Sequence, residues 1–177
     1  MNKILVLYKS KYGAALHYVN LMKESIPCDI FEIDQYKFDT LRQYRCIIAA
    51  GGVYAGHVSC MKSIRKHLSA LTGQSLILFA VGASPYDEEN LEAIRKQNLK
   101  HLPFEVPLFY GRGIYDERIM NFKDRTLCRL LKKSLEKKDP KTFEPWMEAL
   151  WEAAGKSCDW TDPSYLAPLF KYVENLL

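Results

Sequence analysis

The sequence predicts an α/β fold in which helices cover both faces of a five-stranded parallel sheet, a three-layer sandwich. Five short apolar segments alternate with helical segments, which is the pattern of repeated βαβ units. The segments between them are rich in glycine, serine and proline, as expected of loops. With 177 residues the chain is long enough to form one core, and we expect a single domain over residues 1–177.

The five predicted strands differ in polarity, and this difference predicts their order. The first and third are near-continuous apolar runs, typical of strands buried on both faces. Pro107 cannot donate a ladder hydrogen bond, which favours a sheet edge for strand five, while Asp29 and Glu32 favour the other edge for strand two. The strands are expected at Lys3–Tyr8, Cys28–Ile33, Arg45–Ala50, Ser75–Val81 and Val106–Tyr110. The resulting order is 2-1-3-4-5, and its ligand-binding switch point lies between strands one and three.

Helices are predicted in the connections between these strands. The first has apolar residues at helical spacing from Leu16 to Ile26 and is closed by Pro27. A second is expected from about Ser59 to Leu71, and a third, rich in charge, ends at Leu99. Each helix therefore follows a loop at the end of a strand.

The loop after the first strand has residue types that suit a phosphate group. A tight turn that opens a helix offers several backbone N–H donors, and the helix dipole favours the negative charge. Ser10 and Tyr12 can add hydroxyl donors, and Gly13 lets the backbone approach closely. Lys11 either assists or is a solvated loop lysine. The candidate phosphate cradle is Ser10-Lys11-Tyr12-Gly13-Ala14-Ala15.

Two loops resemble those of a known family. Tyr8-x-Ser10-x-x-Gly13 after an apolar strand resembles the FMN-phosphate signature of flavodoxins. Gly51-Gly52-Val53-Tyr54-Ala55-Gly56-His57 resembles the second loop of the same superfamily. The chain is most similar to the branch that includes the menaquinone-dependent protoporphyrinogen IX dehydrogenase, also in its closing motif Asp159-Trp160-Thr161-Asp162. The resemblance implies a flavodoxin-like fold with FMN as the cofactor.

The resemblance also implies which residues contact the flavin ring. Tyr54 is the candidate for stacking or edge packing, and a peptide carbonyl of the glycine-containing loop would turn toward the reactive N5 edge. The alternative is that Gly52 and Gly56 only shape a tight turn. His57 is a candidate proton donor, and the alternative is that it is a surface or capping residue. The candidate ring-binding residues are Gly52, Val53, Tyr54, Ala55, Gly56, Gly82, Ala83 and Ser84.

One position departs from the family pattern. The phosphate loop of the family usually ends in threonine, where this chain has Ala15. A hydrogen bond to a charged group contributes roughly 1.5–3 kcal/mol, so the loss of this hydroxyl weakens FMN binding by about 10- to 100-fold. The alternative is a degenerate site that no longer holds a flavin.

The segment after the fifth strand, from Ile114 to Asp162, exceeds the roughly 2–6 residues of an ordinary connection and is expected to be a helical insertion. Arg118 to Lys138 is predicted to form a basic amphipathic helix. Between Arg112 and Lys141 there are ten basic and five acidic residues, a net charge of +5, although the whole chain carries only +4. Either its apolar stripe packs on the domain, or it contacts anionic lipid or admits an apolar acceptor such as menaquinone.

Several classes of protein are disfavoured by the sequence. No apolar run approaches the ~20 residues of a membrane span, and a strand begins too close to Met1 for a signal peptide. We expect a cytoplasmic location, with a peripheral position at the inner membrane face as an alternative. The five cysteines are widely spaced, so we expect reduced thiols and no metal site. No nucleic-acid-binding module frames the basic residues, so no nucleic acid partner is expected.

The leading functional hypothesis is an FMN-dependent oxidoreductase that transfers a hydride or two electrons at the flavin, with a quinone-linked, protoporphyrinogen dehydrogenase type implied by the resemblance. A flavodoxin-type electron carrier for a redox partner protein is an alternative. Its family members are strongly acidic, whereas this chain has a net charge of +4. A flavin-free interaction module is the third hypothesis. The electron donor and acceptor, a heme precursor as substrate and the oligomeric state are left open.

Overall fold

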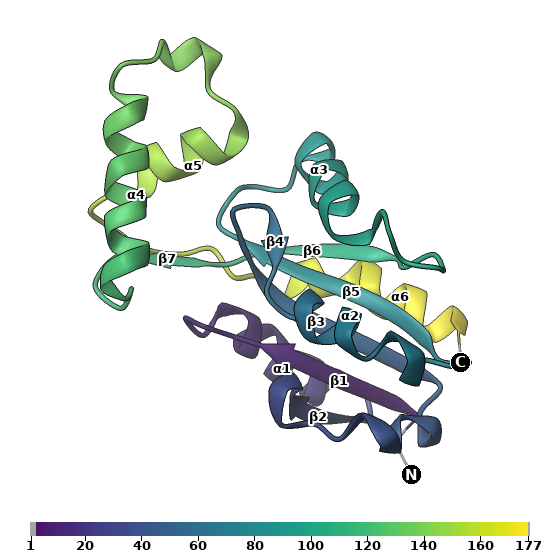
Figure 1. The fold of residues 1–177 in the computed structure, drawn as a ribbon. Coiled ribbons are helices and arrows are strands. Elements are labelled where there is room, and N and C mark those ends of the chain that lie inside the picture. The colour runs from purple at the N-terminus through teal and green to yellow at the C-terminus, as the bar shows by residue number, and fades with distance from the viewer. Residues whose placement is uncertain (1–2, 177) are drawn as a thin grey trace.

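A parallel sheet forms the centre of the computed structural model, which describes residues 3–176 (Figure 1). Its strands lie in the order β2-β1-β3-β5-β6. They are β1 (Ile4–Lys9), β2 (Cys28–Glu32), β3 (Cys46–Tyr54), β5 (Ser75–Gly82) and β6 (Leu108–Arg112). Because β5 and β6 are the predicted fourth and fifth strands, the predicted fold class and strand order are confirmed. The sheet also contains a sixth strand that was not predicted, since the short β4 (His57–Val58) pairs antiparallel with β3.

The strand register explains which strands are central. Val6 pairs with Ile48, and Ile48 pairs with Ile77, so three fully buried apolar side chains follow one another across the middle of the sheet. Pro107 precedes β6 directly, and its carbonyl accepts a hydrogen bond from the N–H of Leu78 (2.9 Å). This carbonyl continues the ladder to β5, and the missing N–H of the proline is tolerated because β6 is an edge strand.

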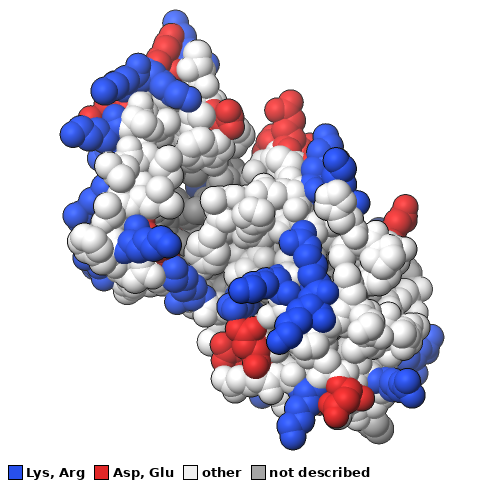
Figure 2. Space-filling view, in the orientation of Figure 1, with Lys and Arg blue, Asp and Glu red and all other residues white. Residues whose placement is uncertain are grey.

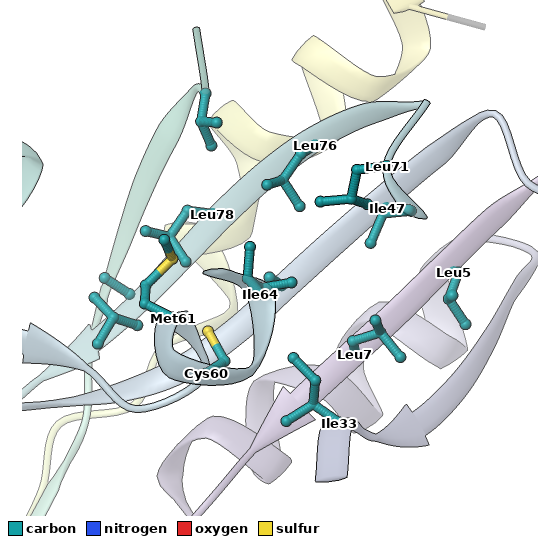
Figure 3. Packing of buried hydrophobic residues seen from close by; sticks show 14 of the residues in the cluster. Leu5, Leu7, Ile33, Ile47, Cys60, Met61, Ile64, Leu71, Leu76 and Leu78 are labelled. Carbon is teal, nitrogen blue, oxygen red and sulfur yellow. The ribbon is translucent and has the colours of Figure 1, made fainter. Parts of the chain in front are cut away.

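Helices cover both faces of the sheet and bury a separate apolar cluster on each. The first face carries α2 (Met61–Lys66) and α3 (Glu88–Leu99), and the second carries α1 (Ala14–Ser25) and α6 (Ala167–Leu176). The cluster under α2 and α3 includes Leu5, Leu7, Ile47, Ile64 and Leu78 (Figure 3). The cluster under α1 and α6 includes Val6, Tyr18, Ile48, Ile77 and Leu169. Alternate residues of one strand therefore serve opposite cores, as a doubly covered sheet requires.

The helix predicted from Ser59 to Leu71 is shorter than expected. It divides at His67 into α2 and the 3₁₀ turn Leu68–Ala70. The His67 ring stacks on Phe38 with centroids 4.0 Å apart, and its Nδ1 contacts the Ser63 carbonyl. Phe38 belongs to a 3₁₀ segment that was not predicted. Two such segments, Ile33–Gln35 and Phe38–Gln43, connect β2 to β3.

The predicted insertion forms a separate lobe beyond the end of β6 (Figure 1). Its base is an antiparallel ribbon of β7 (Ile114–Asp116) and β8 (Ser157–Asp159), neither of which was predicted. The ribbon carries α4 (Phe122–Leu135) and α5 (Pro145–Ala153), joined through the 3₁₀ turn Pro140–Thr142. A small apolar core of its own holds the lobe together, with Tyr115, Leu135, Met147, Leu150 and Ala153 buried. A further 3₁₀ turn, Pro163–Leu166, leads into α6.

The basic helix α4 divides its apolar residues between two environments. Leu131 and Leu135 pack on the core of the lobe. This agrees with the expectation that the apolar stripe packs on the domain, but the surface that the stripe covers belongs to the insertion and not to the sheet. Phe122 is 84% exposed and Leu130 is 60% exposed. Lys and Arg side chains gather on the same lobe, and a notch separates it from the rest of the molecule (Figure 2). No helix within residues 3–176 is long and apolar enough to cross a membrane.

Candidate functional site

The candidate phosphate loop connects β1 to α1 at the carboxyl end of β1. Gly13 adopts φ +93°, and the position of a Cβ on it has no heavy atom within 4 Å. The Ser10 hydroxyl accepts a hydrogen bond from the N–H of Leu16 in the first turn of α1 (3.3 Å). The first turn of α1 contains no acidic residue, and N–H groups at a helix start lack partners within the helix. An open glycine, a hydroxyl and a helix N-terminus fit the phosphate of FMN.

Ala15 occupies the position where the family usually has threonine. Its side chain is only 2% exposed and belongs to the apolar cluster beneath α1. Ala14 beside it is half-buried. Packing against the sheet therefore accounts for the alanine, and the other donors of the loop are retained.

The second candidate loop is a β-hairpin. Val53 and Tyr54 at the end of β3 pair with Val58 and His57 of β4 (His57–Val58). The two turn residues both have positive φ, +48° at Ala55 and +78° at Gly56. Two positive φ values are what a two-residue hairpin turn requires. The sequence predicted a glycine-rich loop at this point, but not the return strand β4.

Helix α3 holds the carbonyl groups of this turn. Asn98 is fully buried, and its amide donates to the Gly56 carbonyl (2.7 Å) and accepts from the N–H of Val58 (2.9 Å). Gln97 donates to the Ala55 carbonyl (3.2 Å). The turn was expected to let a carbonyl rotate toward the flavin, yet both carbonyls already have donors from α3. No sequence pattern singles out Asn98, because one amide within a charged helix is usually exposed.

Tyr54 belongs to the second loop, and its ring lies against Tyr12 of the first loop. Its ring packs over Gly52, where a Cβ would come within 2.9 Å of the ring and the hydroxyl. It meets Tyr12 edge to face, with centroids 6.3 Å apart, and the Lys11 ammonium lies 5.6 Å from its centroid. Tyr54 as a whole residue is 37% exposed, and burial raises its pKa to about 12. The structure thus brings the predicted ring-binding tyrosine to the phosphate loop.

The third candidate loop follows β5 and is held by residues from the end of β6. The Gly82 carbonyl accepts from the N–H of Gly113 (2.7 Å), and the Ala83 carbonyl accepts from Arg112 Nε (3.0 Å). The Ser84 carbonyl accepts from the Tyr110 hydroxyl (2.7 Å). These three contacts hold the loop in place. It lies at the same end of the sheet as the first and second loops, since β5 lies beside β3 and runs parallel to it.

Arg112 also joins this loop to the insertion. Its guanidinium stacks on the Trp160 ring at 4.0 Å, immediately after β8. Neither residue was singled out as part of the site from the sequence. Tyr86, which follows the loop, is exposed, and its hydroxyl donates to Glu88.

The candidate proton donor His57 is the first residue of β4 and pairs with Tyr54. Its side chain is exposed, and its Nε2 lies 2.9 Å from Gln97 Nε2. Because the amide nitrogen can only donate, this ring nitrogen is the acceptor of the pair. Within residues 3–176, no three His, Cys, Asp or Glu side chains are arranged to hold a metal ion.

An acidic residue of the insertion contacts the phosphate loop, and the sequence did not predict this contact. The Asp124 carboxylate accepts hydrogen bonds from Lys11 Nζ and from the Tyr12 hydroxyl. The N–H of Asn121 also donates to the Tyr12 hydroxyl (3.3 Å). The hydrogen bond with Lys11 lowers the pKa of Asp124, and the same bond raises the pKa of Lys11.

Comparison with known proteins places this geometry in context. A family model for the flavodoxin domain matches residues 5–142. No curated protein matches the chain. Similar solved structures include the two-electron reduced flavodoxin of Megasphaera elsdenii, with 13% identity, TM-score 0.49, and coverage of 60% of this chain and 84% of that one. Another is the Trp repressor binding protein from Bacillus subtilis, with 14% identity, TM-score 0.46, and coverage of 63% and 85%. RosB with the bound intermediate 8-demethyl-8-formylriboflavin-5'-phosphate has 11% identity, TM-score 0.45, and coverage of 98% and 88%.

Proposed function

Because this chain belongs to the flavodoxin-domain family, whose cofactor is FMN, we propose that it is an oxidoreductase transferring two electrons or a hydride at the flavin. The flavin supplies the redox chemistry when bound, and the protein supplies position and electrostatics. The observation that carries the proposal is the open phosphate loop beside Tyr54, at the switch point between β1 and β3.

The residues that would hold FMN come from three loops. The hydroxyls of Ser10 and Tyr12 and the N–H groups from Gly13 to Ala15 are assigned to the phosphate, with Lys11 as a nearby cation. Tyr54 is assigned to the ring, whose polar edge would face the β3–β4 hairpin and the loop from Gly82 to Ser84. The protein needs no nucleophile or acid and base pair for this chemistry.

The hairpin supports a two-electron reaction over the carriage of single electrons. A backbone carbonyl that rotates between redox states separates the two one-electron potentials of a flavin, because it binds one state better than the next. Here the carbonyls of Ala55 and Gly56 are held by Gln97 and Asn98. The net charge of +4 also differs from that of acidic carrier flavodoxins.

The insertion supports an apolar acceptor at a membrane surface, as in a quinone-linked enzyme of the protoporphyrinogen dehydrogenase type. Phe122, Leu127 and Leu130 are exposed on α4, and Lys123 and Lys133 lie on the same helix. Exposed apolar and basic residues on one helix are the composition of segments that bind anionic lipid surfaces. We propose that this helix makes peripheral contact with the inner membrane face.

Calorimetric titration with FMN and with riboflavin tests the phosphate assignment. Riboflavin lacks the phosphate, so FMN is expected to bind at least about 100-fold more tightly, the effect of two charge-assisted hydrogen bonds. Gly13→Ala introduces a strained left-handed residue into the cradle, so it should weaken FMN binding about tenfold and leave riboflavin unchanged. Gly73→Ala is the matched control. Gly73 has φ +95° and, like Gly13, no heavy atom within 4 Å of an added Cβ, but it precedes the amino end of β5, and the candidate site lies at the carboxyl ends of the strands.

The outcomes separate the three hypotheses. Absence of binding by any flavin would contradict the proposal and favour the flavin-free interaction module. If flavin binds, spectroelectrochemistry measures its two one-electron potentials. Potentials that lie close together or are inverted support the two-electron reaction, whereas a wide separation indicates the electron carrier.

A further inference from the structure

Asp124 brings a negative charge to the loop that is assigned to the phosphate. Its carboxylate accepts from the Lys11 ammonium and from the Tyr12 hydroxyl, the two side-chain donors at the centre of that loop. Both bonds end on the same oxygen, Oδ2. The carboxylate therefore makes the contacts that a phosphate oxygen would make with these two groups.

The backbone of Asp124 is placed beside the loop by the cap of its own helix. Asn121 caps α4, and its side chain accepts from the N–H of Asp124 (2.8 Å). The N–H of Asn121 donates in turn to the Tyr12 hydroxyl. The first turn of α4 and the phosphate loop thus form one hydrogen-bonded unit.

The rest of α4 belongs to the insertion and not to the sheet. Its buried residues pack on the small core of the lobe, together with α5 and β7. The lobe joins the body at its base, where Trp160 stacks on Arg112. In Figure 1 the far end of α4 extends away from the sheet. The hydrogen bonds of Asp124 therefore attach the N-terminal end of α4 to the phosphate loop.

We propose that Asp124 competes with the FMN phosphate for Lys11 and Tyr12, so that loading of FMN detaches the first turn of α4 from the phosphate loop. This inference rests on the proposed FMN site at Ser10–Ala15. Two anions next to one loop repel each other, and each donor that bonds one of them is lost to the other. The carboxylate lowers the affinity for FMN, and FMN in turn releases the helix.

The coupling is reciprocal. If the seated helix weakens FMN binding by some factor, bound FMN weakens the seating of the helix by the same factor. A surface that binds α4 and draws it from the loop would therefore strengthen the retention of the cofactor. This links cofactor loading to the same helix that carries exposed Phe122 and Leu130.

Asp124→Asn tests the competition. It removes the charge and keeps the size of the side chain, and it should tighten FMN binding about tenfold in calorimetry at fixed ionic strength. Glu136→Gln is the matched control, because it removes one negative charge at the far end of the same helix. That variant should bind FMN with the affinity of the unmodified protein.

Hydrogen exchange of the segment from Arg118 to Leu127 provides a readout that does not depend on activity. In the unmodified protein, FMN should increase exchange in this segment. In Asp124→Asn the exchange should already be high without FMN and should change little when FMN is added. The segment from Ser75 to Val81 serves as the internal reference, since β5 is central in the sheet.

The FMN affinities of the unmodified protein and of Asp124→Asn decide whether the two anions compete. If the unmodified protein binds FMN and Asp124→Asn binds it equally or more weakly, competition is wrong and Asp124 positions the two donors instead. If Asp124→Asn binds FMN and the unmodified protein does not, the competition is supported, and the carboxylate by itself prevents binding. If neither protein binds FMN, the proposed function fails together with this inference.

Discussion

Asn98 lies fully buried between α3 and the β3–β4 hairpin, and its amide makes three hydrogen bonds. It accepts from the N–H of Val58 and donates to the carbonyls of Gly56 and Ile94. The bond to Ile94 is within the helix, and the other two cross to the hairpin. Buried polar groups are nearly always paired, so this one side chain satisfies two backbone groups of the candidate flavin loop.

Asn98→Ala should destabilise the protein by about 2–3 kcal/mol, because it leaves the Val58 N–H and the Gly56 carbonyl without partners in a buried place. The midpoint of urea unfolding, followed by far-ultraviolet circular dichroism, measures this loss. Gln97→Ala is the control, because the Gln97 side chain, next to Asn98 in the sequence, is exposed. We expect this variant to lose no more than about 0.5 kcal/mol of unfolding free energy. A loss of no more than about 0.5 kcal/mol in Asn98→Ala would show that the hairpin does not depend on Asn98.

The contiguous residues of the candidate site form a pattern in the sequence, whereas the residues that contact them from elsewhere in the chain do not. The stretch from Ser10 to Ala15 reveals its strand, turn and helix start within one window. Asp124 lies 113 residues beyond Lys11 and reaches it only because the insertion folds back over the loop. Asn98 likewise contacts a hairpin about 40 residues earlier in the chain. Contacts of this range leave no periodic signal in a single sequence.

At the scale of elements, the ribbon of β7 and β8 depends on one carboxylate. Asp116 accepts from the N–H and the guanidinium of Arg118, and from the Ser157 hydroxyl across the ribbon (2.8 Å). The hydrogen bond with Arg118 holds the pKa of Asp116 well below its usual range. Ionised Asp116 therefore stabilises the base of the insertion.

Acid should weaken the insertion through this group. Because the folded-state pKa of Asp116 is depressed, its contribution is complete above the unfolded pKa of about 4 and is lost as pH falls below that value. Tryptophan emission measures the change, since all three tryptophans, Trp146, Trp151 and Trp160, belong to the insertion. In Asp116→Asn the emission should change less between pH 5 and pH 3, relative to its own value at pH 7. An identical acid transition in both proteins would assign it to other carboxylates.

The long elements were predictable and the short ones were not. Five parallel strands were found within a few residues of their predicted limits, because apolar runs of five or more residues give a clear pattern. β4, β7 and β8 have only two or three residues each, too few for any periodicity. The amphipathic helix was expected from Arg118 to Lys138 and is observed from Phe122 to Leu135, because the Asn121 cap starts it later.

At the scale of the whole molecule, charge and exposed apolar surface coincide on one lobe. The net charge of +4 is contained in the segment from Arg112 to Lys141, and the rest of the chain is close to neutral. The same segment exposes Phe122, Leu127 and Leu130. The lobe lies beyond the carboxyl end of β6, beside the loops assigned to the flavin (Figure 1). A surface bound to the lobe would therefore lie near the cofactor.

Sedimentation with lipid vesicles tests whether that surface is a membrane. The protein should bind vesicles containing anionic phosphatidylglycerol and lose most binding between low and high salt, because exposed charges are screened. The double variant Phe122→Ser and Leu130→Ser should bind at least tenfold more weakly, since it removes two apolar side chains that would enter the interface. Phe104→Ser is the matched control, because Phe104 is exposed on the body next to β6 and should not contribute. Unchanged binding by the double variant would exclude insertion of these side chains into the membrane. Equal binding to neutral and to anionic vesicles would exclude a contribution of the basic residues to membrane binding.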